Sequence, residues 1–322
     1  MAVVIVSYDT RELTLRAVAS AFDARDVDVD VWVVDNASSD GSADAVRDRF
    51  PRARVLALEE NVGFGRGNNA ALERTDAPFV LLLNSDATFA DAGGLRRMVR
   101  ILEEEARVGV VGPRLESPGG DLEYSARAFP GILGELARRL GLFRLIPHAT
   151  RARLLGTEFF DHGRRGEPDW LTGACLLVRG SVLAEVGGFD PGIFLYGEEL
   201  EWCWRVRRAG WSVAFDPSVT VVHHRGASGG TAQAWRVRLA MAGDAYSVRK
   251  HRGGAYFAAF FAARCVALAG EALAQGLLGV LTGSAERRAR SGWASMGLAQ
   301  WMSAVFRGGS AKPGALARGR PA

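Results

Sequence analysis

FVLLLNSDA, residues 79–87, is the stretch from which the fold can be worked out. Four large apolar residues (80–83) are followed at once by Asn84, Ser85 and Asp86. A buried strand ending in ordinary turn formers would explain this pattern, because Asn, Ser and Asp favour turns and cap helices. The alternative is that these polar residues bind a ligand at the end of the strand. The segments around them help to choose between the two.

Strand-like and helix-like segments alternate through residues 1–112. The strand candidates are apolar and rich in β-branched residues, whereas the helix candidates repeat their apolar residues at helical spacing. In chain order the segments are AVVIVSY (2–8), TRELTLRAVASAF (10–22), VDVWVVDNASSDGS (29–42), ADAVRDRF (43–50), ARVLAL (53–58), VGFGRGNNAALERT (62–75) and FVLLL (79–83). This order predicts an α/β fold with a mostly parallel central sheet and helices on both faces.

Polar residues follow several of the predicted strands. In open parallel sheets, ligands bind beyond the carboxyl ends of the strands. Ser7, Asp35 and Asn36 would lie at the same edge as residues 84–86, which favours ligand binding there. Asp35 could accept hydrogen bonds from a nucleobase or a ribose, although a turn with helix capping explains it too. Asn84 and Asp86, two residues apart, would point the same way and suit a divalent cation bridged by substrate phosphates.

The glycine-rich stretch NVGFGRGNNA (61–70) does not match a dinucleotide-binding pattern, because Asn68 occupies the position of the last glycine. No phosphate-binding G-x-x-x-x-G-K-[ST] loop occurs in the sequence either. Glycines before a helix still allow a diphosphate to approach backbone N–H groups. A dinucleotide-dependent oxidoreductase is therefore disfavoured, whereas a nucleotide diphosphate remains possible as a ligand.

YGEELEWCWRVRRAGW (196–211) places Glu198, Glu199 and Glu201 beside tryptophans. Like charges in a partly dry site raise one another's pKa, which suits a general base. The alternative is a helix N-terminus enriched in acids that pair with the following arginines. VVHHRGAS (221–228) ends a predicted strand with His223. A metal or diphosphate role and a structural role are both open for this histidine.

The positive charge of the chain is concentrated in its C-terminal part. Residues 236–322 contain 13 Lys and Arg against three acidic residues, whereas the preceding 235 residues contain 27 basic and 33 acidic residues. A basic, apolar tail indicates an anionic partner, and a membrane surface fits better than nucleic acid because no nucleic-acid module is recognisable. The three cysteines form no C-x-x-C pair, and the N-terminus reads as a strand, so a reducing, cytoplasmic location is expected.

Taken together and in this order, the segments resemble family 2 glycosyltransferases. The similarity covers about residues 2–230 and is strongest to the rhamnosyltransferase-like branch that extends bacterial cell-wall and surface polysaccharides. It is carried by VIVSYDTRELTLRAVAS, VVDNASSDGS, NVGFGRGNNA, LLLNSDA, LTGACLLVRG, GGFDPGIFLYGEELEWCWRVRRAGW and VVHHRGAS. The resemblance implies a GT-A fold with a Rossmann-like sheet, a nucleotide-sugar donor, Mg²⁺ or Mn²⁺ as cofactor, and inverting transfer.

The resemblance also implies roles for individual residues on the donor side. Ser7 and Asp35, with the neighbouring Asn36, match positions that hold the base and the ribose. Asn68 lies in the family's loop near the nucleotide. The metal-binding D-x-D motif is represented by two further residues. Asp86 matches its last acid, and Asn84 replaces its first Asp, as this branch often shows.

On the catalytic side, Glu198 and Glu199 match the family's Glu-Asp pair, whose second acid is the base. Arg205 matches an arginine that follows the pair, while Gly173 and Glu201 are expected near the acceptor or donor sugar. The histidine stretch is matched as well. His223 is the histidine of the H-x-x-G-x-S stretch, completed here by Gly226 and Ser228, and is expected to reach the metal or the diphosphate.

We therefore expect residues 1–235 to form a GT-A catalytic domain. It would move a sugar, with dTDP-rhamnose favoured as donor, to a hydroxyl of a glycan or a polyprenyl-linked saccharide. A nucleotidyltransferase would be expected to carry a glycine-rich, basic N-terminal loop, and VSYDTREL contains no glycine. A non-catalytic carbohydrate-binding protein would not need Glu199, Asp86 and His223 at one edge.

Residues 236–322 are expected to form a helical appendage with a flexible end that binds the inner face of the plasma membrane peripherally. Arg264, Glu271 and Gln275 would occupy one narrow stripe of a helix between 255 and 281. A wide apolar face would remain, and the arginines after it would attract anionic lipid. The alternative is a helix packed on the catalytic domain. The residues expected on the apolar face are Phe257, Phe260, Phe261, Leu268 and Leu278. The arginines expected to attract lipid are Arg287, Arg288 and Arg290.

Overall fold

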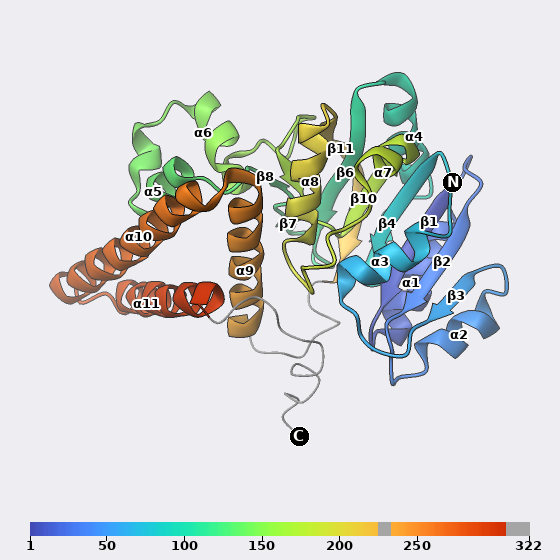
Figure 1. Ribbon diagram of the computed structural model, residues 1–322, viewed down its shortest axis with the longest axis horizontal. Coiled ribbons are helices and arrows are strands. Elements are labelled where there is room, and N and C mark those ends of the chain that lie inside the picture. The colour runs from blue at the N-terminus through green and yellow to red at the C-terminus, as the bar shows by residue number, and fades with distance from the viewer. Residues whose placement is uncertain (225–232, 307–322) are drawn as a thin grey trace.

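The computed structural model describes residues 1–224 and 233–306. These residues form a curled central sheet with helices packed around it, and a triangle of long helices that stands on the side away from the N-terminal strands (Figure 1). The predicted α/β architecture with a C-terminal helical appendage is confirmed.

The first half of the sheet is parallel, as predicted. Strands β3, β2, β1 and β4 lie side by side in this order, and each neighbouring pair is parallel. Three helices connect them. The bounds are β1 (Ala2–Ser7), α1 (Arg11–Phe22), β2 (Asp30–Asp35), α2 (Ser42–Arg49), β3 (Arg54–Ala57), α3 (Phe64–Leu72) and β4 (Phe79–Asn84).

The second half of the sheet is mixed. Strand β10 runs antiparallel between β4 and β6, β11 is parallel to β6, and β5 closes the edge antiparallel to β11. The bounds are β5 (Ala87–Phe89), α4 (Gly94–Glu104), β6 (Val108–Glu116), β10 (Cys175–Arg179), α7 (Gly180–Val186), α8 (Glu198–Arg208) and β11 (Ser212–His223). A short strand β7 (Leu122–Glu123) pairs with β6, and β8 (Ala126–Arg127) pairs with β9 (Trp170–Leu171) in a separate ribbon.

The sheet is covered on both faces because its strands alternate their side chains. In β1, Val3 and Ile5 pack in one core with α1, α2 and α4. Ala2 and Val4 point the other way, into a core that includes residues of α3, α7 and α8. The acid-rich helix α8 is therefore held against the sheet by its own apolar side.

Short helices fill residues 132–159. They are α5 (Ile132–Arg139), the 3-10 helices η1 (Leu142–Leu145) and η2 (Thr157–Phe159), and α6 (His148–Leu155). Each spans at most eight residues. Such short segments carry little periodicity in the sequence, which explains why they were not foreseen.

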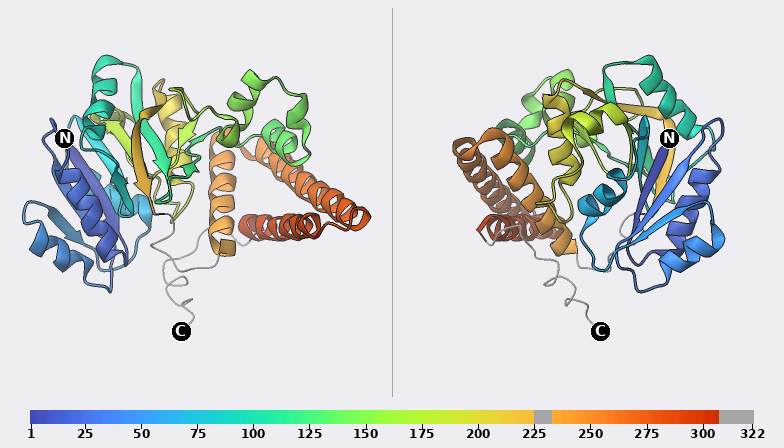
Figure 2. Two further views of the ribbon diagram at one scale, coloured as in Figure 1. Left: turned by 180° about the vertical axis from the view of Figure 1, so that it is seen from behind. Right: turned by 45° about the vertical axis from the view of Figure 1, so that its right-hand side comes forward.

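The C-terminal region consists of α9 (Gln233–Arg252), α10 (Gly254–Leu281) and α11 (Ala285–Phe306), arranged as a triangle (Figure 2). Its core packs Phe260, Leu268 and Trp301 against Leu200 and Trp204 of α8. Helix α9 begins at Gln233, close to the expected boundary at residue 235. Residues 307–322, for which a flexible end was expected, lie outside the described residues.

The assignment of the two faces of α10 needs correction. Phe260 and Leu268, expected on the membrane-facing side, are fully buried and flank Arg264 on the same side of the helix. Arg264 is itself buried and forms ion pairs with Glu135 of α5 and Asp244 of α9. The polar stripe therefore faces protein, because its charge finds partners there. The exposed apolar face lies on the opposite side of α10.

Candidate active site

The predicted edge of polar residues exists in the structure. Ser7 pairs in register with Asp35, and Val6 of the same strand pairs with Asn84. The ends of β1, β2 and β4 therefore lie in one row, and they bring together residues 7, 35–36 and 84–86. The glycine stretch joins them, because Asn36 accepts a hydrogen bond from Val62 N–H at 2.9 Å.

Asp35 has a buried carboxylate oxygen without a hydrogen-bond partner. It is 5% exposed, its Oδ2 accepts a hydrogen bond from Ser38 N–H at 3.1 Å, and its buried Oδ1 has no partner. A buried acceptor without a partner is costly unless a ligand or water completes it. Its position fits the expected contact with ribose or base.

The other nucleotide-side residues make contacts within the protein. Asn36 donates to Asn61 Oδ1 at 2.9 Å and so holds the loop before α3. Asn68 is buried and donates to Phe64 O within α3 at 3.0 Å. Both side chains shape the glycine loop in this conformation, although the sequence predicted contact with the nucleotide.

Ser7 lies in a cluster of hydroxyl groups that the sequence did not reveal. Its Oγ is 2.8 Å from Thr14 Oγ1, and Thr10 donates to Ser85 Oγ at 3.0 Å. Ser7 is fully buried. The cluster fixes the end of β1 to the end of β4, which makes the row of polar residues rigid. Thr10, directly before α1, and Thr14 within it are four residues apart and so lie on one side of the helix. This spacing is the signal that could have indicated the hydroxyl cluster.

Asp86 and His223 meet at the far end of the row. His223 Nε2 is 3.2 Å from Asp86 Oδ1, and His223 Nδ1 is 3.0 Å from Glu123 Oε2. Burial alone would lower the pKa of His223, but hydrogen bonds and charge from Asp86 and Glu123 raise it to about 9. The contact of Glu123 with the second ring nitrogen was not foreseen, because Glu123 lies 100 residues away in the chain.

This corner fits a divalent cation. The Asp86 carboxylate and His223 Nε2 could both coordinate a metal, and the buried Asn84 Oδ1 lacks a hydrogen-bond partner. Glu123 would orient the histidine from behind, as carboxylates do for metal-bound histidines. Within residues 1–224 and 233–306 no group of three or more His, Cys, Asp or Glu side chains could hold a metal by itself. Diphosphate oxygens of a donor would have to complete the coordination.

The acid pair begins α8. Glu198 is buried, and its Oε2 has no hydrogen-bond partner. Burial, with the charge of Glu199, raises the pKa of Glu198 well above its usual range. Burial also raises the pKa of Glu199, although backbone hydrogen bonds from Gly197 and Gly173 and the charge of Arg127 oppose this. The N–H of Gly197 donates to Glu199 Oε2, whereas Glu198 Oε2 has no partner, so the surroundings favour Glu199 as the carboxylate of the pair.

Gly173 lies directly beside this carboxylate. A Cβ placed on Gly173 would lie 3.7 Å from Glu199 Cβ and 3.6 Å from a ring carbon of Phe64. The glycine thus joins the acid pair to the loop before α3. A role of Gly173 in lining the sugar site stays a prediction.

Tyr196 is a site residue that the sequence did not indicate. Burial raises the pKa of Tyr196, and the charges of Glu198, Glu199 and Asp86 raise it further, against the charge of Arg236. Its backbone φ is +66°, a left-handed conformation that is uncommon outside glycine. Strained backbone of this kind often occurs at ligand sites.

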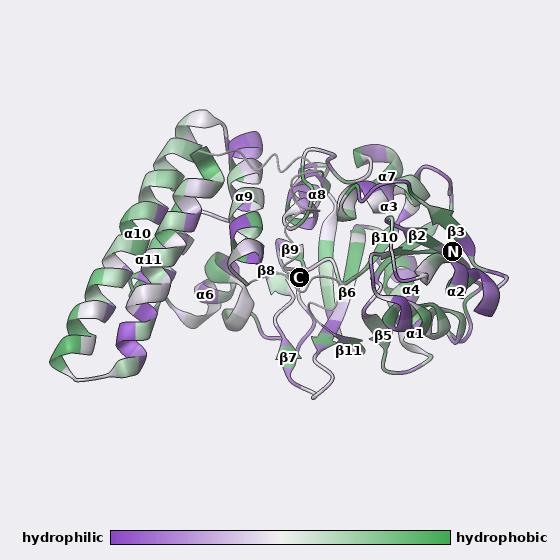
Figure 3. Cartoon of the chain, turned by 90° about the horizontal axis from the view of Figure 1, so that it is seen from below, coloured by the Kyte–Doolittle hydropathy of each residue, from purple (hydrophilic) through white to green (hydrophobic). Residues whose placement is uncertain are grey.

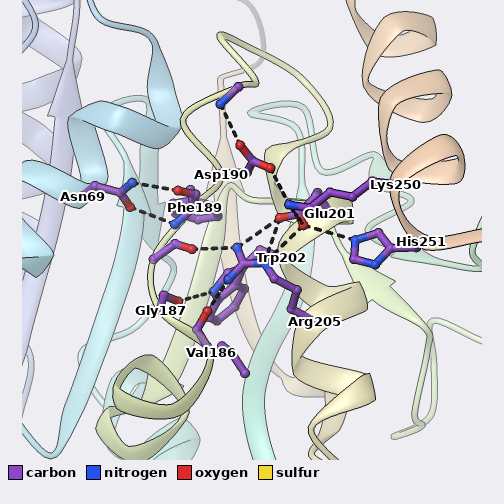
Figure 4. Close-up of polar contacts among 12 residues, drawn as sticks. Asn69, Val186, Gly187, Phe189, Asp190, Glu201, Trp202, Arg205, Lys250 and His251 are labelled. Atoms are coloured by element: carbon purple, nitrogen blue, oxygen red, sulfur yellow. Dashed lines mark hydrogen bonds and ion pairs between the residues drawn. The ribbon is translucent and has the colours of Figure 1, made fainter.

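Glu201 and Arg205 of α8 belong to a network of polar contacts that reaches Lys250 and His251 of α9 (Figure 4). The Glu201 carboxylate, with no exposed surface, lies 3.0 Å from Arg205 Nη2, 2.8 Å from Lys250 Nζ and 3.1 Å from His251 Nε2. Burial would raise the pKa of Glu201, but His251, Lys250 and Arg205 together lower it. With both oxygens engaged, Glu201 does not face a sugar in this conformation. The sugar contact expected for it is replaced by a structural role.

Arg205 extends this network to the chain before α8. It donates to Gly188 O at 2.6 Å and to Val186 O, and Trp202 donates to Gly187 O at 2.9 Å. Arg205 therefore does not lie in the catalytic row, and it holds the segment that leads to Glu198. Gly226 and Ser228 of the histidine stretch lie outside the described residues.

Solved structures with the same fold are glycosyltransferases. A mannosyltransferase from Pyrobaculum calidifontis, solved with GDP-mannose and Mn²⁺, is 16% identical with a TM-score of 0.61, and the match covers 95% of this chain and 87% of that one. TarS of S. aureus, solved with UDP-GlcNAc, is 15% identical with a TM-score of 0.53, covering 94% and 81%. The fold is therefore that of the GT-A glycosyltransferases.

The sequence comparisons define the family. The model for glycosyl transferase family 2 matches residues 2–162. An N-acetylglucosaminyl-diphospho-decaprenol L-rhamnosyltransferase from Mycobacterium tuberculosis is 31% identical over 240 residues, which are 71% of this chain and 77% of that protein. The chain belongs to glycosyl transferase family 2. It is a glycosyltransferase, and the nucleotidyltransferase and non-catalytic alternatives are set aside.

Proposed function

We propose that the protein transfers rhamnose, with inversion, from dTDP-rhamnose to a hydroxyl of a lipid-linked saccharide. Support for the sugar and the acceptor comes from the similarity to the decaprenol-linked rhamnosyltransferase. The observation that carries the chemistry is the row of Asp35 and the Asp86–His223 pair at one sheet edge, with the acid pair beside it. Glu199 lies against Gly173, and the O of the next residue, Ala174, accepts a hydrogen bond from Asn84 N–H at 2.9 Å.

Glu199 acts as the general base in this proposal. Its raised pKa makes it a better proton acceptor than an ordinary glutamate, yet it still ionises before Glu198. It takes the proton of the acceptor hydroxyl, whose oxygen then attacks the anomeric carbon from the face opposite the diphosphate. The nucleoside diphosphate leaves, and the configuration of the anomeric carbon is inverted.

Asp86, His223 and Asn84 hold Mg²⁺ or Mn²⁺ together with the diphosphate in this proposal. The bound cation would offset the negative charge that develops on the leaving diphosphate. Asp35 accepts a hydrogen bond from the nucleoside through its free Oδ1. The solved mannosyltransferase with Mn²⁺ supports a divalent cation, and it does not distinguish Mn²⁺ from Mg²⁺ for this chain.

A donor panel tests this function. The full chain would be incubated with dTDP-rhamnose, UDP-sugars and GDP-sugars, with and without a short-chain polyprenyl-diphospho-GlcNAc acceptor. Acceptor-dependent release of dTDP, but not of UDP or GDP, is expected. Acceptor-dependent release from another donor would reject rhamnose and retain the transferase. No acceptor-dependent release from any donor would reject the proposed function.

We also propose that the C-terminal helices bind the inner surface of the plasma membrane. Helix α10 is the one described helix long and apolar enough to cross a membrane, by length and composition. The ribbon of α10 is coloured mostly as hydrophobic along its length (Figure 3). Its exposed residues from Gly254 to Leu281 are small or aliphatic, and α11 exposes further large apolar residues. The large exposed apolar residues of these two helices are Val266, Leu273, Leu277, Leu278, Val280 and Leu281 of α10, and Trp293, Met296, Met302 and Phe306 of α11.

Charge supports a lipid surface as the partner of this face. The three acids of the region are all paired, Asp244 with Arg264, Glu271 with Arg139, and Glu286 with Arg290. Since these acids are offset, the excess of basic over acidic residues in the region leaves it positively charged, and anionic headgroups attract positive charge. Because the ion pairs of Arg264 tie one side of α10 to protein, the helix would lie in the interface and not cross it.

Vesicle flotation tests the membrane proposal. The full chain should float with anionic vesicles, and Leu273→Glu with Leu277→Glu should abolish this. A matched control adds the same two carboxylates to exposed positions of α7, Ser181→Glu with Ala184→Glu, and should float like wild type. Equal flotation of all three proteins would show that the exposed face of α10 does not bind the membrane. A dimer in solution that the leucine variant converts to a monomer would show instead that this face binds a second copy.

A further inference from the structure

The segment between α7 and α8, residues 187–197, lies directly on the glycine loop before α3. Phe64 N–H donates to Phe194 O at 3.1 Å, and Arg66 Nε donates to Pro191 O at 3.0 Å. Gly63 has φ +87°, and a Cβ there would lie 2.1 Å from Phe194 O. No side chain fits between the two segments at this point, so a shift of one would displace the other.

Helix α9 holds the same segment from the other side. Lys250 Nζ contacts Asp190 Oδ2 at 2.5 Å and Glu201 Oε1 at 2.8 Å, and Tyr246 Oη donates to Asp190 Oδ2 at 2.8 Å. A Cβ added to Gly243 would lie 2.4 Å from Tyr196 O, so α9 and the segment meet backbone to backbone. The segment is thus enclosed between the glycine loop and the C-terminal region.

The end of this segment positions the acid pair. Gly197, with φ +100°, precedes the first residue of α8, and its N–H donates to Glu199 Oε2 at 3.3 Å. Tyr196, also with positive φ, precedes it. Non-glycine residues keep such a conformation only where the surroundings hold it. The orientation of the Glu199 carboxylate therefore depends on how firmly residues 187–197 are held.

We infer that Lys250 is a positioning residue of the active site, joining Asp190 to Glu201 and so fixing residues 187–197 and the Glu199 carboxylate. The effect on catalysis rests on the proposed role of Glu199 as base. The C-terminal region then has a second role besides the proposed membrane binding. It completes the catalytic domain, because the cation that joins the loop to α8 comes from α9.

The contacts of Lys250 indicate that its loss should spare the fold. Its side chain is 39% exposed, and exposed ion pairs contribute little to stability. Glu201 would keep Arg205 and His251 as partners, so no buried charge would be left alone. Asp190 would lose its cation and keep only Tyr246 and the N–H of Gly192. The expected damage is therefore to the loop.

The test compares Lys250→Met with Arg249→Met. Arg249 is the exposed neighbour on α9, and no contact of its side chain is described, so its variant removes the same charge from the same helix. Lys250→Met should lower kcat by roughly ten- to a hundredfold, as displaced catalytic groups do. Its affinity for nucleoside diphosphate and its thermal midpoint should match wild type. Lys250→Arg should recover most of kcat, and Arg249→Met should be unchanged.

Hydrogen exchange supplies a readout that does not depend on the reaction. Amides of residues 187–197 should exchange faster in Lys250→Met than in Arg249→Met. If exchange rises but wild type transfers no sugar, the proposed function fails and the loop contact stands. Unchanged exchange, or faster exchange with unchanged kcat, would overturn the positioning role. A fall in kcat shared equally by Arg249→Met would overturn it too.

Discussion

Glu198 and Glu199 should respond very differently to the same isosteric change. Glu198 is buried without a partner for its Oε2, and it retains its proton because burial and the neighbouring charge raise its pKa. Glutamine is a close copy of a protonated glutamate. Glu198→Gln should therefore keep kcat within about fivefold of wild type, since the replaced group is neutral in both proteins. Glu199→Gln cannot accept a proton from the acceptor.

The cost of losing the base can be bounded. A lost general base lowers turnover by roughly 10²- to 10⁴-fold, which corresponds to about 3 to 5 kcal/mol in the activation free energy. Affinity for nucleoside diphosphate should hardly change, because the proposed base acts on the acceptor hydroxyl and not on the nucleotide. In wild type, kcat should fall as pH drops through the raised pKa of Glu199, and this acid limb should lie above pH 4.5. Glu198→Gln should show the same fall of kcat at low pH as wild type.

The raised pKa of Glu198 also predicts how the free energy of unfolding depends on pH. At pH values between 4.5 and its raised folded pKa, Glu198 binds a proton that the unfolded chain releases. The free energy of unfolding therefore falls with rising pH, by at most about 1.4 kcal/mol per pH unit from this group. Glu198→Gln removes this slope, so its stability relative to wild type should grow as pH rises above 4.5.

Two assays decide this prediction. Acceptor-dependent release of nucleoside diphosphate between pH 5 and 9 gives kcat for each variant, and urea unfolding over the same range gives stability. An active Glu199→Gln beside a dead Glu198→Gln would reverse the two roles. If Glu201→Gln were dead while Glu199→Gln turned over, the assignment of the acid pair would be wrong. A stability difference between Glu198→Gln and wild type that does not vary with pH would refute the protonated state of Glu198.

Three further outcomes follow from the contacts described. Asp86→Ala should abolish the Mn²⁺-dependent part of nucleoside diphosphate binding, and calorimetric titrations of wild type and variant that agree would remove Asp86 from the metal site. In the metal-free protein, the ion pairs of His223 should add at most about 3 kcal/mol of stability, fully present below pH 6.5 and lost as pH rises through about 9. Replacement by Gln should remove this pH dependence in urea titrations, and an unchanged profile would contradict the charged state of the ring. Gly63→Ala should lose nucleoside diphosphate binding, because its Cβ would lie 2.1 Å from Phe194 O. Gly173→Ala, whose Cβ would have contacts of 3.6 Å or more, should fold normally and lower kcat. Normal nucleotide binding by Gly63→Ala would refute the close contact.

The parallel half of the fold and the row of polar residues could be predicted because both depend on local sequence. Each of β1, β2 and β4 is an apolar run that ends in Ser7, Asp35 or Asn84, and parallel strands bring such ends together. The antiparallel insertion of β10 between β4 and β6 could not be predicted. Strand direction at that point depends on a connection of more than 50 residues whose short helices carry little pattern.

The roles of Glu201 and Arg205 were missed for a different reason. In the sequence, Glu201 belongs to the same acidic cluster as Glu199, and nothing local separates the two. Their difference arises from Lys250 and His251, some 50 residues away on α9, which neutralise Glu201 and leave Glu199 free. Likewise, the apolar face of α10 was assigned wrongly because Arg264 seemed to mark the exposed side. Its partners Glu135 and Asp244 lie on other helices.

One measurement tests the central claim most directly. The full chain, Mn²⁺, dTDP-rhamnose and a short-chain polyprenyl-diphospho-GlcNAc acceptor would be incubated, and the product analysed by NMR at the anomeric carbon. The account predicts a rhamnosyl product whose anomeric configuration is opposite to that of the donor, formed with one dTDP released per sugar transferred and lost in Glu199→Gln. A product that retains the donor configuration, or one formed at the wild-type rate by Glu199→Gln, would contradict it.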